Sequence, residues 1–83
     1  MKRKKRKYFY QPESERRRGL WLEHYGIVGN DGKIVELWVY NTWQDPKTWS
    51  HMIREPRDNW DTPPNPEWLT EKEFKHRLFM TML

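Results

Sequence analysis

The chain has 83 residues, six tryptophans, no cysteine and a formal net charge of +4. A chain of this length forms one domain at most, and the lack of cysteine excludes disulfides and cysteine-ligated zinc. No apolar run approaches the roughly 20 residues of a membrane span, and the charged N-terminus lacks the apolar segment of a signal peptide. We therefore expect no membrane partner and a cytoplasmic location, or a nuclear one if the host cell is eukaryotic.

The positive charge is concentrated at the N-terminus. Residues 1–18 carry nine cations and two carboxylates, a net charge of +7. Residues 19–83 carry seven cations and ten carboxylates, a net charge of −3. This partition predicts a basic N-terminal arm over residues 1–18 and a small folded body over residues 19–83.

The arm is the strongest functional signal in the sequence. Cations placed near phosphates release counterions from nucleic acid, which gives affinity without sequence specificity. Aromatic rings beside cations stack on exposed bases or wedge into a groove. A nuclear-import signal and a solvated tail are the alternative interpretations of this charged run. The predicted nucleic-acid-binding residues are Lys2, Arg3, Lys4, Lys5, Arg6, Lys7, Tyr8, Phe9, Tyr10, Arg16, Arg17 and Arg18.

The body begins with a strong hairpin signal. Two runs of β-branched and aromatic residues, 20–28 and 33–40, flank the turn sequence Gly-Asn-Asp-Gly at residues 29–32. With Asp31-Gly32 as a two-residue turn, Val28 is expected to pair with Val35, Gly26 with Leu37 and His24 with Val39, which places an aliphatic set on one face. The opposite, aromatic face is predicted to hold Trp21, Tyr25, Ile27, Trp38 and Tyr40, together with Glu23 and Glu36. Because these glutamates would repel phosphates, this ribbon is not expected to be the nucleic-acid reader.

The segment after the hairpin suggests a short helix and then a loop. Asp45-Pro46 resembles an N-cap followed by proline at the first helical position, so we expect a helix through about Ile53. Trp49 and Ile53, four residues apart, would form its inner face. Residues 54–66 contain four prolines and are predicted to be an ordered crossing that tryptophan side chains hold against the body.

The C-terminal segment predicts a second helix. Thr70 and Glu73 match a capping box, and a helix from Glu71 to about Met82 would follow. Its apolar stripe is expected to contain Phe74, Leu78, Phe79 and Met82. The expected fold is therefore α+β: a small antiparallel β-hairpin or sheet covered by one or two helices, with a basic N-terminal arm.

No arrangement of residues in the sequence has the spacing that catalysis or metal binding needs. The three histidines, His24, His51 and His76, form no zinc-binding motif, and the serines lie in no nucleophile-elbow context. The Gly-Asn-Asp-Gly segment lacks the lysine and following helix of a phosphate-binding loop. We therefore predict a protein that is not an enzyme and has no metal or cofactor.

One partial resemblance covers residues 21 to 46. Trp21 and the segment Trp43-Gln44-Asp45-Pro46 are similar in spacing to the two tryptophans and the final proline of a WW domain, which binds proline-rich peptides. Ile34 and Val35 or their neighbours stand where that family has its central tyrosine pair, and Asn41-Thr42 directly precedes Trp43, which leaves no room for a second turn and third strand. For these reasons the binding residues of the family are not carried over.

Two classes of function follow from these features. The first is a small nucleic-acid-associated accessory or regulatory protein, such as a phage or viral protein or a component of a ribonucleoprotein. The alternative is a protein-binding adaptor or inhibitor, because tryptophan dominates many protein-protein hot spots. The surface predicted for this alternative consists of Trp43, Trp49, Trp60 and Trp68.

Overall fold

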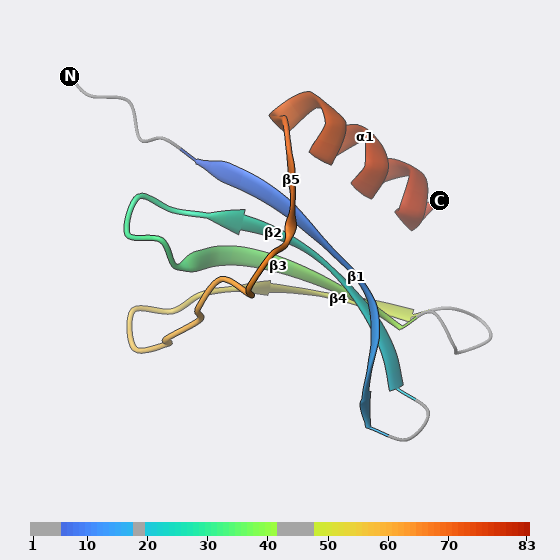
Figure 1. Cartoon of the computed structure of the whole chain (residues 1–83), viewed down its shortest axis with the longest axis horizontal. Helices are drawn as coiled ribbons and strands as arrows, with labels where there is room; N and C mark the ends of the chain where they lie inside the picture. Colours follow the sequence, from blue (N-terminus) through green and yellow to red (C-terminus); the bar gives the residue numbers. More distant parts are fainter. Residues whose placement is uncertain (1–5, 18–19, 42–47) are drawn as a thin grey trace.

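A computed structural model of the chain shows one antiparallel sheet with a helix lying across one of its faces (Figure 1). The structure describes residues 6–17, 20–41 and 48–83, and side chains are placed for all of these except residues 13–17, 20 and 21. This arrangement confirms the α+β class. The elements are β1 (Lys7–Arg17), β2 (Leu20–Val28), β3 (Ile34–Asn41), β4 (Thr48–Ile53), β5 (Glu67–Leu69) and α1 (Glu71–Met82).

The order of strands across the sheet is β4-β3-β2-β1-β5. The first four strands follow one another as antiparallel neighbours, whereas β5 crosses to the far side and pairs with β1. In that pairing Tyr8 lies opposite Leu69, 61 positions further along the chain. The two outer strands, β4 and β5, therefore lie at opposite edges.

The structure places the second half of the predicted arm inside the sheet. Residues Lys7–Arg17 form β1, which pairs with β2 along its length and lies between β2 and β5. The tyrosine and phenylalanine side chains at the start of this strand alternate between two apolar layers, and their burial outweighs the high charge of the neighbouring residues. Of the remaining arm residues, Arg6 is described, whereas residues 1–5 and 18 lie outside the described residues.

An aromatic layer fills the space between the sheet and α1. Phe74 is buried, and its ring centroid lies 5.1 Å from that of Tyr8, 6.1 Å from that of Tyr25 and 5.8 Å from that of Trp38. These three rings come from adjacent strands, β1, β2 and β3. The Phe74 side chain therefore packs α1 against the three central strands of the sheet. Such tilted and edge-on ring pairs stabilise a core beyond the area that they bury.

The other face of the sheet has its own small core. Phe9 is fully buried at 0% exposure and clusters with Val28 and Ile34, while Leu37 and Trp60 pack against them. An extra carbon on Gly26, which lies opposite Phe9 in the register, would come within 2.2 Å of the Phe9 ring. Phe9 therefore occupies the space that a side chain at Gly26 would fill.

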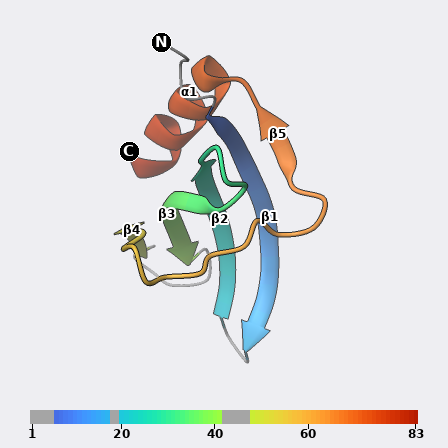
Figure 2. The same cartoon turned by 90° about the vertical axis from the view of Figure 1, so that its left-hand side faces the viewer.

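Residues 54–66 cross this second face from β4 to β5 (Figure 2). The backbone N–H of Ile34 donates to the carbonyl of Trp60 at 2.9 Å, and the Thr62 hydroxyl donates to the carbonyl of Gly32 at 2.8 Å. Lys33 and Asp61 form an ion pair beside these bonds. The prediction of an ordered crossing held down by tryptophan is confirmed for Trp60.

The hairpin between β2 and β3 is present, but its turn is longer than predicted. The Gly32 N–H donates to the Gly29 carbonyl at 3.1 Å, and the Gly29 N–H donates to the Lys33 carbonyl at 2.9 Å. Gly32 has a φ of +78°, which is the left-handed position of a three-residue hairpin loop. The prediction of a two-residue turn at Asp31-Gly32 was therefore wrong, because the loop contains three residues.

The longer turn changes the register at the end of the hairpin only. Gly26 pairs with Leu37 as predicted, but Val28 pairs with Ile34 instead of Val35, with a bulge between these positions. Val35 consequently packs with the aromatic layer beneath α1, on the face opposite to the one expected for it. A bulge inserts one residue into one strand and turns the following side chain over.

The predicted helix ending at Ile53 was wrong, because residues Thr48–Ile53 form strand β4. The spacing between Trp49 and Ile53 does not distinguish the two structures, since positions four apart share a face both on a helix and on a strand. The local composition, T-W-S-H-M-I, has strand-forming residues, and β3 presents an edge with which they can pair. Asp45 and Pro46 lie outside the described residues.

The predicted helix at the C-terminus is confirmed over Glu71–Met82, together with its capping box. The Glu73 N–H donates to the Thr70 hydroxyl at 3.1 Å, and the Thr70 N–H donates to the Glu73 carboxylate at 3.3 Å. Phe74 and Leu78 face the sheet, whereas Phe79 is 61% exposed and does not belong to the buried stripe.

We expect Gly26→Ala to destabilise the fold by about 1–3 kcal/mol, because the added carbon overlaps the buried Phe9 ring. Combining Gly26→Ala with Phe9→Leu should cost less than the sum of the two single changes, since the smaller side chain makes room. Urea denaturation of the four proteins in this cycle measures the coupling. Additive costs would show that the two residues do not compete for one space.

We also expect the capping box to produce a dependence of stability on pH. The hydrogen bonds with Thr70, first to its side chain and then to its backbone, hold the pKa of the Glu73 carboxyl below its usual value of 4.5. A lowered folded pKa means that the stabilisation is present above pH 4.5 and is lost as the pH falls through the folded pKa. Urea midpoints measured from pH 3 to pH 6 should therefore fall less steeply for Glu73→Gln than for the native chain. Glu55→Gln, at an exposed loop position, is the control and should keep the native profile.

Candidate nucleic-acid interface

An open hollow of about 480 Å³ lies where β1 begins and α1 begins. Its volume is in the range of small-molecule and nucleotide sites, about 300–1,000 Å³. The start of β1 brings two cations to it, and β5 brings a tryptophan from the other end of the chain. The lining residues are Arg6, Lys7, Tyr8, Trp68, Leu69, Thr70 and Glu71.

Strand geometry explains why a lysine and a tryptophan meet here. Side chains alternate along a strand, so Lys7 points to the same face as Phe9. Trp68 lies opposite Phe9 in the β1–β5 register and shares that face. The Lys7 ammonium nitrogen consequently lies 5.6 Å from the centroid of the Trp68 ring, a cation–π distance.

The Trp68 ring packs against the core on one side and is exposed to solvent on another. Its centroid lies 6.1 Å from that of Phe9, with the two rings edge to face at 75°. Because Phe9 is fixed in the core, this contact orients the indole. Trp68 is nevertheless 50% exposed, so much of its aromatic surface is available to a partner.

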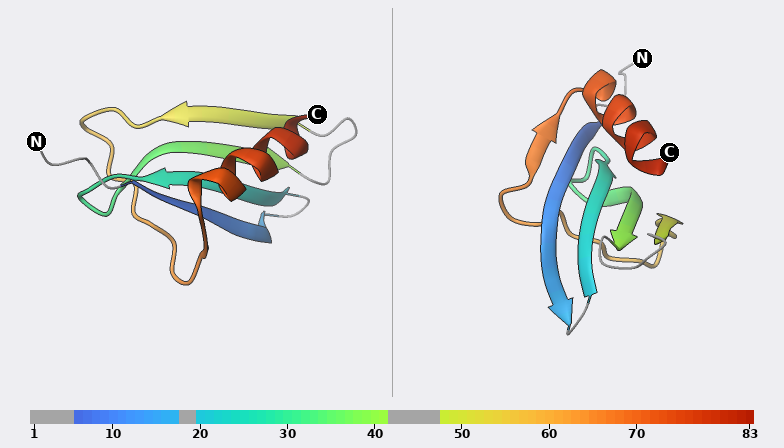
Figure 3. Two further views of the ribbon diagram at one scale, coloured as in Figure 1. Left: turned by 90° about the horizontal axis from the view of Figure 1, so that it is seen from above. Right: turned by 90° about the vertical axis from the view of Figure 1, so that its right-hand side faces the viewer.

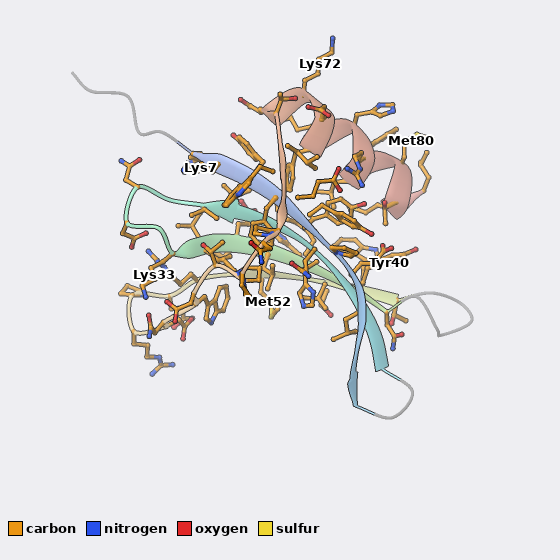
Figure 4. All side chains as sticks on the ribbon, viewed as in Figure 1. Lys7, Lys33, Tyr40, Met52, Lys72 and Met80 are labelled. Atoms are coloured by element: carbon orange, nitrogen blue, oxygen red, sulfur yellow. The ribbon has the colours of Figure 1, made fainter. Side chains whose placement is uncertain are left out.

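The charges around the hollow are predominantly positive. Arg6 and Lys7 are both exposed. The carboxylate in the lining, Glu71, forms an ion pair with Lys75 at 2.7 Å, and this contact holds the pKa of the Glu71 carboxyl below its usual value. Lys72 projects away from the sheet at the same end of the helix (Figure 4). An approaching anion therefore meets Arg6 and Lys7, which form no ion pair within the described part of the chain, and a carboxylate that already has a partner.

A capping box occupies part of the N-terminus of α1. A helix N-terminus attracts anions through free backbone N–H groups. Here the Glu73 N–H is bonded to Thr70, and the side chain of Glu73 returns to the Thr70 N–H. The Glu73 N–H is therefore already bonded, and the cationic groups in the lining of the hollow are the side chains of Arg6 and Lys7.

The three aromatic residues predicted to stack on bases belong to the core. Phe9 has no exposed surface, and Tyr8 and Tyr10 are half-buried in the aromatic layer beneath α1. The Tyr10 hydroxyl donates to Glu23 at 2.9 Å, and burial and then this bond raise its pKa well above the usual value. Phe9 therefore cannot stack on a base in this fold. The exposed ring beside the cations is that of Trp68.

The remaining predicted nucleic-acid contacts are placed only in part. Arg6 and Lys7 lie in the hollow. Arg16 and Arg17 belong to β1, but their side chains are not among those described. Lys2, Arg3, Lys4, Lys5 and Arg18 lie outside the described residues.

The four tryptophans predicted as a protein-binding surface do not form one patch. Trp49 lies on β4 and Trp68 on β5, at opposite edges of the sheet. Pairing places Trp49 on the face that carries α1 and Trp68 on the other face. Trp60 is half-buried in the second core, and Trp43 lies outside the described residues.

Within the parts of the chain that the structure describes, no group of three or more histidine, aspartate or glutamate side chains could hold a metal ion. His51 instead stacks on Trp38, with ring centroids 4.4 Å apart, and its Nε2 lies 2.6 Å from the Glu36 carboxylate. Among the same residues no helix is long and apolar enough to cross a membrane.

Sequence reasoning did not connect Trp68 with the basic segment. The contact depends on the pairing of β1 with β5, which are separated by most of the chain. The local signals were present separately: a cationic run, and a tryptophan just before a helix N-cap. No family model, no curated protein and no solved structure matches this chain. The candidate site is therefore identified from the residues of this chain alone.

Proposed function

We propose that the protein is a small nucleic-acid-associated accessory or regulatory protein that binds single-stranded DNA or RNA at the hollow between β1 and α1. The observation that carries the proposal is the Lys7–Trp68 pair, a cation beside a half-exposed indole in an open, basic hollow. Proteins that bind single strands combine this type of aromatic surface with cations that follow the backbone.

The two kinds of residue have separate roles. The Trp68 ring supplies a stacking surface for one unpaired base, which is worth about 1–3 kcal/mol in such sites. Arg6 and Lys7 contact the phosphates beside that base, and the cations at residues 2–5 extend the contact along the strand. A base inside a duplex has both faces covered by its neighbours, so this arrangement favours unpaired nucleotides.

We expect Trp68→Ala to weaken binding to a labelled single-stranded oligonucleotide by about 5- to 150-fold, the loss that corresponds to one stacked base. Met80→Ala is the control, because Met80 is a similarly exposed apolar side chain in the last turn of α1, outside the lining of the hollow. Fluorescence anisotropy with single-stranded DNA, single-stranded RNA and duplex DNA measures both variants. Equal effects of the two substitutions would contradict the proposed site.

We expect replacement of the four cations at residues 2–5 by glutamine to reduce the salt dependence of binding. Each phosphate contact to a single strand contributes about 0.7 to the slope of log affinity against log salt concentration. Titrations at several salt concentrations should therefore show a shallower slope for this variant, whereas Trp68→Ala should lower affinity and leave the slope nearly unchanged. An unaltered slope in the glutamine variant would show that the cations at residues 2–5 do not contact phosphates.

A further inference from the structure

The outer edge of β4 has no partner among the described residues. β4 pairs with β3 on one side only and stands last in the strand order. All six of its residues, Thr48–Ile53, are exposed. An open edge of this kind presents unpaired backbone N–H and C=O groups to another strand.

The register shows which residues of β4 point these groups outward. The Arg54 N–H donates to the Val35 carbonyl at 2.9 Å, which marks this as a hydrogen-bonded pair. Hydrogen-bonded and non-bonded pairs alternate along an antiparallel ladder, so Met52 and Ser50 also bond inward to β3. The backbone groups directed to the open edge are those of Trp49, His51 and Ile53.

The same three residues present a largely apolar surface. Their side chains lie on the face that carries α1, where Trp49 is 42% exposed and Ile53 is 67% exposed. Natural sheet edges usually carry lysine, proline or a bulge, each of which prevents a further strand from pairing. β4 contains no lysine, arginine, carboxylate or proline, and its pairing with β3 is regular.

The nearby flank of α1 extends this surface. Arg77 lies against Tyr10 and forms an ion pair with Glu67, so one flank of the helix faces β1 and β5. At 100° per residue, Met82 lies about 80° from Phe74 on the other flank, toward β3 and β4, whereas Phe79 lies further round on the solvent side. Figure 3 shows that the C-terminal end of α1 lies over this side of the sheet. Both side chains are substantially exposed.

We propose that β4 is a dimer interface, at which a second copy of this chain adds its own β4 antiparallel and continues the sheet. A two-fold axis through His51 pairs Trp49 of each copy with Ile53 of the other. In this register each outward residue meets an outward residue of the second copy, giving three hydrogen-bonded pairs. Shifting the strands by two residues leaves fewer such pairs, because one outward residue then extends past the β4 of the other copy.

Charge explains why a second copy is the occupant. In an antiparallel two-fold pairing the strand lies beside a copy of itself, so a strand with charges of one sign would repel the second copy. β4 contains no lysine, arginine or carboxylate, and its histidine, His51, already lies against Glu36 of its own copy. The opposite edge of the sheet differs, because β5 is three residues long and carries Glu67. β4 is therefore the edge that can meet itself without repulsion.

The size of the contact sets the expected strength. Each copy contributes one short strand and three exposed apolar side chains, Trp49, Ile53 and Met82, which is small beside the roughly 1,200–2,000 Å² of stable interfaces. We therefore expect a dimer with a dissociation constant of about 1 μM or weaker. Sedimentation equilibrium of the full chain from about 2 to 500 μM should show conversion of monomer into dimer.

Ile53→Lys tests the interface, since it adds a charge opposite Trp49 of the second copy without removing a bond to β3. Asn59→Lys adds the same charge at an exposed loop position and is the control. The proposal requires Ile53→Lys to weaken dimerisation at least tenfold and Asn59→Lys to leave it unchanged. A native chain that stays monomeric at 500 μM, or two lysine variants that behave alike, would overturn it.

The absence of cysteine allows a direct test of the register. In the proposed dimer the two His51 Cα atoms face each other at about 5.5 Å, within the range of a disulfide. His51→Cys should therefore oxidise to a covalent dimer at least tenfold faster than Ser50→Cys or Asn59→Cys, with folding of each checked by circular dichroism. Ser50→Cys reacting as fast as His51→Cys would overturn this register. These measurements involve no nucleic acid, so they are independent of the proposed function.

Discussion

The contact between Phe9 and Gly26 is the constraint on which the packing of the sheet face opposite α1 depends. A sheet with a single covering helix has a second apolar face, and here no second helix is present among the described residues to cover it. The Phe9 ring fills the space above Gly26 and joins β1 to β2 on that face. Because Phe9 also orients Trp68, the same ring links the core to the exposed aromatic surface of the hollow.

The features predicted well from the sequence are those determined by neighbouring residues. The β2–β3 hairpin, the capping box at Thr70 and the helix from Glu71 to Met82 each depend on contacts within a few positions. The strand β4 was not predicted, because a four-residue spacing suits a helix and a strand equally and the choice depends on the free edge of β3. Tertiary pairing decides such short segments.

In the candidate site, too, local features were predictable from the sequence and long-range contacts were not. The cationic run was visible in the sequence, and Arg6 and Lys7 do lie in the hollow. The partner ring could not be predicted, because Trp68 reaches Lys7 only through a pairing between strands at the two ends of the chain. Charge density also concealed the strand character of Tyr8 and Tyr10, since a run of lysines and arginines resembles a solvated tail.

The pairing of β5 with β1 has a consequence for how the chain is made. Residues 67–69 leave the ribosome last among the strands, long after β1, β2 and β3 can form their antiparallel hairpins. Until they arrive, β1 is an open edge with Phe9 and two tyrosines beside it and no α1 above them. Contacts between such distant residues slow folding because a long loop must close first. The nascent protein is therefore most prone to aggregation in the interval before residues 67–83 emerge.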